Sequence, residues 1–319
     1  MNKIKVAVVG CGHWGKNLAR NFAELGALKY IIDSDFETAK LHAALYNVSA
    51  IEMSEALIDN DISGVVIAAP AELHKELALQ AIAAGKHVYV EKPLALSVSD
   101  GEIIRDAAKA AKVSLMVGHL LQYHPVFVEL RGMVKNGDLG KLRYAYSHRL
   151  SMGKFRLEED AFWSLAPHDV SMLLSIFNEE PNEIRGGGLD FITSGIADES
   201  RVDMIFPSGG RAHIFTSWLH PFKEQRLVVI GDKSMAVFDD TKPWEEKLAI
   251  YSYIVDKSGA IPAPVKSAVR FIKVPNGEPL KNECQHFIDC ISSGDTPFTD
   301  GEEALRVLRV LEAPTLPQG

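Results

Sequence analysis

The chain has 319 residues, of which 47% are hydrophobic and 24% charged, and its formal net charge is −8. This composition excludes a disordered chain, and the negative charge argues against nucleic acid or an anionic membrane as a main partner. No run of about 18 apolar residues occurs, so no membrane-spanning helix is expected. The length suffices for two domains with substantial cores.

Cysteine usage and the start of the chain indicate the compartment. Cys11, Cys284 and Cys290 are too few and too scattered for a disulfide framework or a zinc site, so we expect no metal. Met1 lies just before the first apolar run, which leaves no room for a signal peptide. We therefore expect a reducing, cytoplasmic setting.

The beginning of the chain has the layout of a βαβ unit. Residues 4–9 are an apolar, β-branched run typical of a buried strand, and residues 16–25 place apolar side chains on one helical face. Residues 10–15, between them, read G-x-G-x-x-G, and a second apolar run, residues 28–32, ends at Asp33. Strand, glycines, helix, strand and acid in this register predict a Rossmann dinucleotide-binding site, although a βαβ unit without a nucleotide remains an alternative.

Each residue of this fingerprint has a physical role. Gly10 allows a tight turn, Gly12 lets the backbone approach a pyrophosphate, and Gly15 lets the helix pack close to the strand. The helix N-terminus offers free N–H groups to the phosphates, and we expect His13 and Trp14 to lie at the same loop. Asp33 can accept hydrogen bonds from both ribose hydroxyls and would repel a 2′-phosphate, which favours NAD over NADP.

Strands and helices continue to alternate to about residue 118. This alternation predicts a doubly wound parallel sheet with both faces covered, and hence an NAD-binding domain over residues 1–118. The expected helices span residues 36–45, 54–60 with Ser54 as the cap, 73–84 and 98–111, and the expected strands span residues 48–51, 64–69, 87–90 and 114–117.

The pattern changes near His119, where longer β-like segments begin. Several of them alternate apolar with polar residues, and Gly209-Gly210 is typical of a hairpin turn. We predict an α+β domain over residues 119–319, with a large, mostly antiparallel sheet and a second subunit covering its outer face as a homodimer or homotetramer. The expected strands are 142–150, 183–188, 200–206, 211–218, 225–230, 235–239, 248–253 and 269–274, and the expected helices are 125–134, 168–177, 280–291 and 302–311.

Further motifs carry a family resemblance. Glu91-Lys92-Pro93 follows a predicted strand, and Ala68-Ala69-Pro70 with His74 follows another. With the glycine fingerprint, these motifs resemble the Gfo/Idh/MocA family of nicotinamide-dependent sugar oxidoreductases over the whole chain. The resemblance implies NAD as cofactor, and it implies further cofactor contacts at Ala69, Pro70, His74, Glu91, Lys92, His119 and Gln122.

Two departures from the family pattern narrow the resemblance. Trp163 to Asp169 aligns with the family's D-x-G-x-H segment, which puts its histidine at His168 but replaces its aspartate by Ser164. The usual asparagine-arginine pair is replaced within residues 118–125. Together these features resemble the branch that oxidises C3 of UDP-linked N-acetylhexosamines, either UDP-N-acetylglucosamine or its glucuronate.

Lys92 and His168 are the expected catalytic residues. Lys92 at a strand's carboxyl end points into the ligand crevice, and a neutral lysine beside a cationic nicotinamide can accept a hydroxyl proton. The imidazole of His168 titrates in the working range and is suited to the same task. The alternatives are a surface lysine before a proline and a histidine that fills space under the sheet, while Asp169 is expected to be an acid in the first turn of a helix.

The residues expected at the substrate combine positive charge with aromatic rings. His148, Arg149 and Arg156 form a basic group in an acidic protein, and a guanidinium suits the diphosphate of a sugar nucleotide. A solvated strand face is the alternative. Tyr123 and Trp163 complete the expected substrate residues, although Trp163 could equally be part of the core.

Two other functions remain open. A Gfo/Idh/MocA enzyme could act on a free sugar or inositol, and a protein that keeps the fold could be a non-catalytic NAD-binding regulator. The presence of both Lys92 and His168 argues against the regulator, and the basic group favours the nucleotide sugar.

Overall fold

The computed structural model describes residues 4–314, which fall into two compact units. Unit 1 comprises the chain up to Tyr123 together with Glu278–Leu308, and unit 2 comprises His124–Gly277 with the residues from Arg309 onward. By its contacts the C-terminal segment Glu278–Leu308 belongs to unit 1, and the predicted domains 1–118 and 119–319 stay a prediction. Contacts between segments far apart in sequence decide this, and periodicity cannot reveal them.

Unit 1 is built on a six-stranded sheet with the order β3-β2-β1-β4-β5-β6, and its neighbouring strands are parallel. The chain runs from β1 outward to β3 and then returns beside β1 as β4, so the carboxyl ends of β1 and β4 flank a topological switch point. The predicted doubly wound sheet is confirmed. Its strands are β1 (Val6–Val9), β2 (Leu28–Ile32), β3 (Ser49–Ala50), β4 (Gly64–Ile67), β5 (His87–Val90) and β6 (Leu115–Val117).

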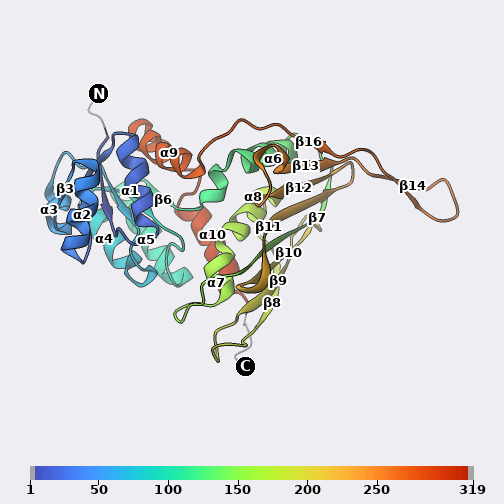
Figure 1. Cartoon of the computed structure of the whole chain (residues 1–319), viewed down its shortest axis with the longest axis horizontal. Coiled ribbons are helices and arrows are strands. Elements are labelled where there is room, and N and C mark those ends of the chain that lie inside the picture. Colours follow the sequence, from blue (N-terminus) through green and yellow to red (C-terminus); the bar gives the residue numbers. More distant parts are fainter. Residues whose placement is uncertain (1–3, 315–319) are drawn as a thin grey trace. The chain divides into compact units, whose positions relative to one another are not determined.

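Helices cover this sheet (Figure 1). Phe22 of α1 and Phe287 of α9 meet edge to face with ring centroids 6.4 Å apart, and Phe287 also meets Tyr89 of β5. α4 packs against β4 and β5, and α5 packs against α4. The helices of unit 1 are α1 (Gly15–Glu24), α2 (Phe36–Tyr46), α3 (Met53–Ile58), η1 (Ala71–Leu73), α4 (His74–Ala83), α5 (Val98–Ala111), η2 (Leu120–Tyr123), α9 (Pro279–Ser293) and the start of α10 (Gly301–Glu312).

Helix ends in unit 1 follow local capping chemistry. Ser97 accepts the Asp100 N–H at the start of α5, which begins and ends where the sequence predicts. The predicted cap of α3 at Ser54 is wrong, because Glu52 and Glu55 form a capping box two residues earlier.

Unit 2 contains an eight-stranded sheet with the order β16-β13-β12-β11-β7-β10-β9-β8. Among the residues described, β7 pairs in parallel with β10 and the other neighbours are antiparallel, so the predicted large, mostly antiparallel sheet is confirmed. The β9–β10 hairpin turns at Gly209-Gly210, also as predicted. The strands are β7 (Leu142–Met152), β8 (Glu183–Leu189), β9 (Glu199–Ile205), β10 (Arg211–Ser217), β11 (Leu219–Gly231), β12 (Met235–Asp239), β13 (Leu248–Tyr251) and β16 (Arg270–Phe271).

One face of this sheet is packed and the other is open. α8 packs on β7 and β10, and α6 packs on α8 and β12. Ala145 and Ser147 of β7 are buried toward these helices, whereas Tyr146 and His148 alternate onto the other face. The remaining elements of unit 2 are α6 (Pro125–Lys135), α7 (Ala161–Leu165), α8 (Pro167–Phe177), η3 (Trp244–Glu246), β14 (Ile254–Asp256) and β15 (Ala263–Val265). No helix in the described part of the chain combines the length and the apolar character needed to cross a membrane.

Candidate functional site

The glycine loop between β1 and α1 has the geometry of a phosphate-binding turn. Gly10 has φ +89°, and a Cβ there would lie 2.7 Å from the Ala68 carbonyl oxygen, so only glycine fits without strain. A Cβ at Gly15 would lie 1.9 Å from the Gly10 carbonyl oxygen, which is the close helix–strand approach expected of the third glycine. Gly12 is exposed with open space where its side chain would be. The loop therefore leaves room for a pyrophosphate at the N-terminus of α1.

Asp33 lies at the carboxyl end of β2, beside this loop. Its Oδ2 accepts the Cys11 N–H at 2.7 Å, and its Oδ1 accepts the Asp35 N–H at 3.0 Å. These two bonds fix the carboxylate next to the glycine turn, where Asp33 is partly exposed. A fixed carboxylate at this position fits the ribose hydroxyls of NAD. His13 and Trp14 are exposed on the same loop.

The turn after β4 is tied to the segment after β5 by one buried histidine. His74, 1% exposed, lies 2.9 Å from the Ala69 carbonyl oxygen through Nε2 and 2.7 Å from the Pro93 carbonyl oxygen through Nδ1. Burial lowers the pKa of His74. Its place in the core makes it a crosslink that positions the Ala69-Pro70 turn and the residue that follows Lys92.

Glu91 and Lys92 follow β5 directly. The Glu91 carboxylate accepts the Trp14 Nε1–H at 2.6 Å and the Lys92 N–H at 3.3 Å. Burial raises the pKa of the Glu91 carboxyl to about 7. Glu91 therefore connects the phosphate loop to the backbone of Lys92, a link that the sequence motif did not predict.

The segment after β6 is anchored to α10 and to the loop before it. His119, 2% exposed, lies 2.5 Å from Glu303 through Nδ1, and the Tyr123 hydroxyl lies 3.0 Å from Thr299 Oγ1. Gln122 is also buried. Glu303 and Thr299 were not predicted as site residues.

Trp163 and His168 lie on two short consecutive helices of unit 2. Asp160 caps α7 by accepting the Trp163 N–H at 2.9 Å, and Ala166 ends α7 and begins α8. His168 is the second residue of α8, and its side chain is half-buried. Lys92 lies in unit 1 and His168 in unit 2.

Arg149 on β7 is part of a buried ion pair. Its Nε lies 2.5 Å from Asp169 Oδ2 and its Nη2 lies 3.1 Å from Oδ1, a bidentate arrangement. The Ser147 hydroxyl donates to the same carboxylate at 2.5 Å, and the Asp169 side chain is 1% exposed. Asp169 thus locks α8 onto β7 beside His168, and the predicted contact of Arg149 with a diphosphate stays a prediction.

The predicted basic group does not form a single cluster. His148 and Arg149 are consecutive on a strand and so point to opposite faces, with His148 paired to Glu224 at 3.0 Å. Arg156 lies in the loop after β7, 44% exposed, and its Nε is 3.1 Å from Glu159. The alternation of a strand separates these charges, although they are close in the sequence.

Comparison with known proteins agrees with this geometry. Residues 4–119 match the oxidoreductase family with an NAD-binding Rossmann fold, and residues 127–237 match the GFO/IDH/MocA C-terminal domain. The solved structure of GenD2 from gentamicin A biosynthesis, in complex with NAD, has a TM-score of 0.82 at 23% identity and covers 98% of this chain and 93% of its own.

Two curated relatives span nearly the full length. A UDP-N-acetylglucosamine 3-dehydrogenase from Acidithiobacillus ferrooxidans is 26% identical over 97% of this chain and 95% of its own, and its solved structure has a TM-score of 0.86 at 25% identity, covering 98% and 96%. A myo-inositol 2-dehydrogenase from Thermotoga maritima is 24% identical over 96% and 93%. The family matches, the glycine loop and the strand order together mean that this chain belongs to the Gfo/Idh/MocA family of oxidoreductases, which act on CH–OH groups with NAD.

Proposed function

We propose that this protein oxidises the C3 hydroxyl of a UDP-N-acetylhexosamine, either UDP-N-acetylglucosamine or its glucuronate, to a 3-keto sugar. The observation that carries the proposal is the full-length similarity to a UDP-N-acetylglucosamine 3-dehydrogenase. The replacement of the common family aspartate by Ser164 supports it, as does the segment of residues 118–125, because both resemble that branch.

In this proposal NAD supplies the hydride acceptor, and the chain supplies position and proton transfer. Lys92 accepts the C3 hydroxyl proton, because its backbone is held at the carboxyl end of β5 by Glu91 on one side and by the His74 contact to Pro93 on the other. His168 is the second acid–base group. Gly12 and Asp33 hold the pyrophosphate and the adenosine ribose.

The substrate residues are Tyr123, Arg149, Arg156, Trp163 and His168. Arg156 is the residue best suited to a diphosphate, because it is exposed and its partner Glu159 lies on the same loop. Arg149 is less suited, because its guanidinium is already bidentate with Asp169.

A substrate panel tests the proposal. UDP-N-acetylglucosamine, its glucuronate, free N-acetylglucosamine and myo-inositol are each incubated with NAD, and the absorbance of reduced nicotinamide is followed. Oxidation of one UDP-sugar, with a product that an aminotransferase can trap, is the expected result. The Lys92→Met variant serves as the control for background reduction.

The second candidate is a dehydrogenase of free inositol. It is favoured by the full-length similarity to myo-inositol 2-dehydrogenase at 24% identity. Reduction of NAD with myo-inositol but with neither UDP-sugar would replace the first proposal by this one.

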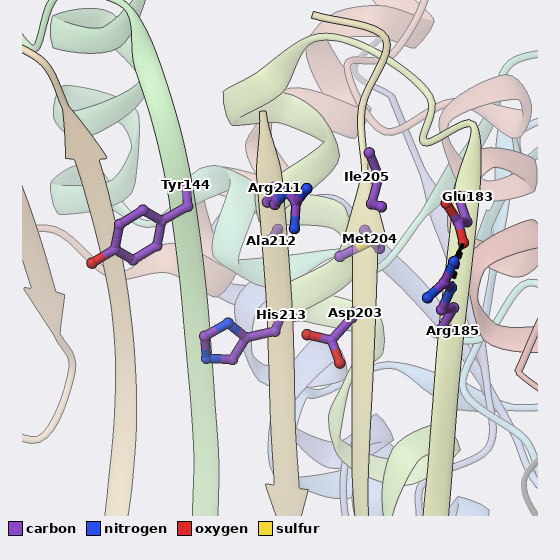
Figure 2. Close-up of a pocket in the computed structure, with 9 residues that line it drawn as sticks. All are labelled: Tyr144, Glu183, Arg185, Asp203, Met204, Ile205, Arg211, Ala212 and His213. Atoms are coloured by element: carbon purple, nitrogen blue, oxygen red, sulfur yellow. Dashed lines mark hydrogen bonds and ion pairs between the residues drawn. The ribbon is translucent and has the colours of Figure 1, made fainter. Parts of the chain in front are cut away.

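We also propose that a second copy of the chain covers the open face of the eight-stranded sheet, as a homodimer or homotetramer. On this face the Tyr146 and His213 rings stack 5.1 Å apart. A pocket of about 370 Å³ that includes His213 in its lining adjoins these rings. Figure 2 shows Glu183 and Arg185 of β8 paired at this pocket. A face with rings and charges of both signs suits self-complementary pairing. The pocket is lined by Tyr144, Glu183, Arg185, Asp203, Met204, Ile205, Arg211, Ala212 and His213.

Light scattering after size exclusion tests this arrangement. Tyr146→Glu should produce monomers, because it places an unpaired charge in the covered face. Arg143→Glu, an exposed residue of the same strand that alternates to the opposite face, is the matched control. A monomeric unmodified protein would refute the proposal.

A further inference from the structure

Unit 1 contains a buried carboxyl, Glu283 on α9, that has no role in the cofactor motif. Its side chain is 0% exposed. Neither carboxyl oxygen meets the distance and angle of a hydrogen bond among the residues that the structure describes, and the Tyr89 hydroxyl is the neighbouring donor. An ionised carboxylate in this position would lose its hydration without compensation, which costs several kcal/mol in proteins.

The groups that face Glu283 do not offer a positive charge. They are Glu91 after β5, Tyr89 on β5, Tyr123 in η2 and Cys284 on α9 itself. Phe287, one helical turn away, stacks edge to face with Tyr89 at 5.9 Å and closes the site on its apolar side. Burial and the nearby Glu91 raise the pKa of Glu283 well above its usual value, which favours its protonated form.

Glu91 has the opposite surroundings, although the two carboxyls are neighbours. Three donors reach its carboxylate: Trp14 Nε1 at 2.6 Å, the Tyr89 hydroxyl at 3.2 Å and the Lys92 N–H at 3.3 Å. A Cβ at Gly118 would lie 3.0 Å from its Oε2, so glycine at this position leaves the room that the carboxylate occupies. These donors favour the ionised form of Glu91.

We propose that above neutral pH Glu91 and Glu283 share one proton, which Glu283 holds, and that ionised Glu91 is a positioning residue that holds the Trp14 loop and Lys92 in register. Two adjacent carboxyls of like charge release their protons in separate steps, and the values belong to the pair. The charge-assisted bond from Trp14 weakens when the pair takes up its second proton, on Glu91. The effect of Glu91 on catalysis rests on the proposed function, in which Lys92 accepts the substrate proton. The shared proton does not depend on that function.

The proton is detected without a substrate by the fluorescence of Trp14. The emission difference between the unmodified protein and Trp14→Phe is titrated with pH, because a protonated carboxyl and a carboxylate affect an indole differently. We expect a midpoint near pH 7, the pKa of Glu91. Glu91→Gln should abolish the transition. Glu283→Gln should leave the midpoint unchanged, because a neutral amide has the same charge as the protonated carboxyl that it replaces.

Glu278→Gln is the matched control. Glu278 precedes the same helix, is 41% exposed and pairs with Arg20, so its variant should leave the midpoint unchanged. A flat titration in the unmodified protein overturns the proposal. A Glu283→Gln midpoint about one unit or more below that of Glu278→Gln also overturns it, because such a shift would show that Glu283 is ionised. The titration of the unmodified protein does not depend on whether a variant of Glu91 folds.

A rate measurement separates positioning from a merely structural role. Glu91→Gln should lower kcat by about ten- to a hundredfold, the value of one hydrogen bond to a charged group, and should remove the acidic limb of the pH–rate profile. KM for NAD should change much less, since Gly12 and Asp33 are untouched. If the fluorescence results hold but no UDP-sugar is oxidised, the shared proton stands and the proposed function fails.

Discussion

Loss of Arg149 should destabilise unit 2 far more than loss of any exposed arginine nearby. Arg149→Ala removes both guanidinium bonds to Asp169 and leaves that carboxylate, 1% exposed, with the Ser147 hydroxyl alone. The remaining charge is buried without compensation. Because Asp169 anchors α8 to β7, the loss also loosens the start of the helix that carries His168.

The magnitude follows from the burial of the pair. Removing one partner of a buried ion pair costs about 3–5 kcal/mol, because the other charge stays desolvated. For a domain of this size each kcal/mol corresponds to about 2–4 °C, so the melting temperature should fall by about 6–20 °C. Arg156→Ala should change stability by about 0.5 kcal/mol or less, because Arg156 is 44% exposed and its pair with Glu159 is at the surface.

Thermal and denaturant unfolding of the two variants decide the question. The double variant Arg149→Met with Asp169→Leu should recover much of the loss, since it removes the unpaired charge as well as the pair. Equal stability of Arg149→Ala and Arg156→Ala would refute the reasoning. Titration of both variants with UDP-sugar is a separate measurement, in which a tenfold to hundredfold weaker binding would assign a substrate contact.

Three further outcomes are expected. Asp33→Ser should narrow the preference for NAD over NADP in binding titrations, and equal or better NADP binding by the unmodified protein would contradict the assigned role of Asp33. Lys92→Met should reduce turnover by about 10²–10⁴ with little change in NAD affinity, and near-normal turnover would make Lys92 structural. Folding raises the pKa of Glu91 to about 7, so its contribution to stability is complete below the unfolded value near 4.5 and is lost as pH rises toward 7. Chemical denaturation should therefore show that the free energy of unfolding falls by up to about 3 kcal/mol over this pH range. The Glu91→Gln variant should lack this decrease. The same pH dependence in that variant would rule out Glu91 as its origin.

Most elements of unit 1 could be predicted because local chemistry defines them. Strands β2 and β5 and helix α5 begin and end where the sequence indicates, since glycine, serine and the change of hydrophobic period mark their ends. Helix α7 was not predicted, because Ala161–Leu165 is too short to display a helical period. The β14–β15 hairpin was also missed.

The sequence by itself determined the nucleotide-binding half of this protein. Gly10, Gly12, Gly15 and Asp33 act through backbone conformation and a fixed spacing, and both are properties of a continuous stretch of chain. The same holds for the position of Lys92 at the end of β5, because a strand followed by proline is a local pattern. The alternation of strands with helices was enough to predict the parallel sheet that places them.

Only the tertiary structure decided which polar side chains pair with residues that are distant in the sequence. The packing of α8 on β7 brings Asp169 to Arg149, and Glu303, 184 residues away in the sequence, lies beside His119. Glu283 reads as one of many helical acids until α9 is placed against β5. Burial and charge pairing depend on which elements meet, and the periodicity of a single element contains no record of its partner.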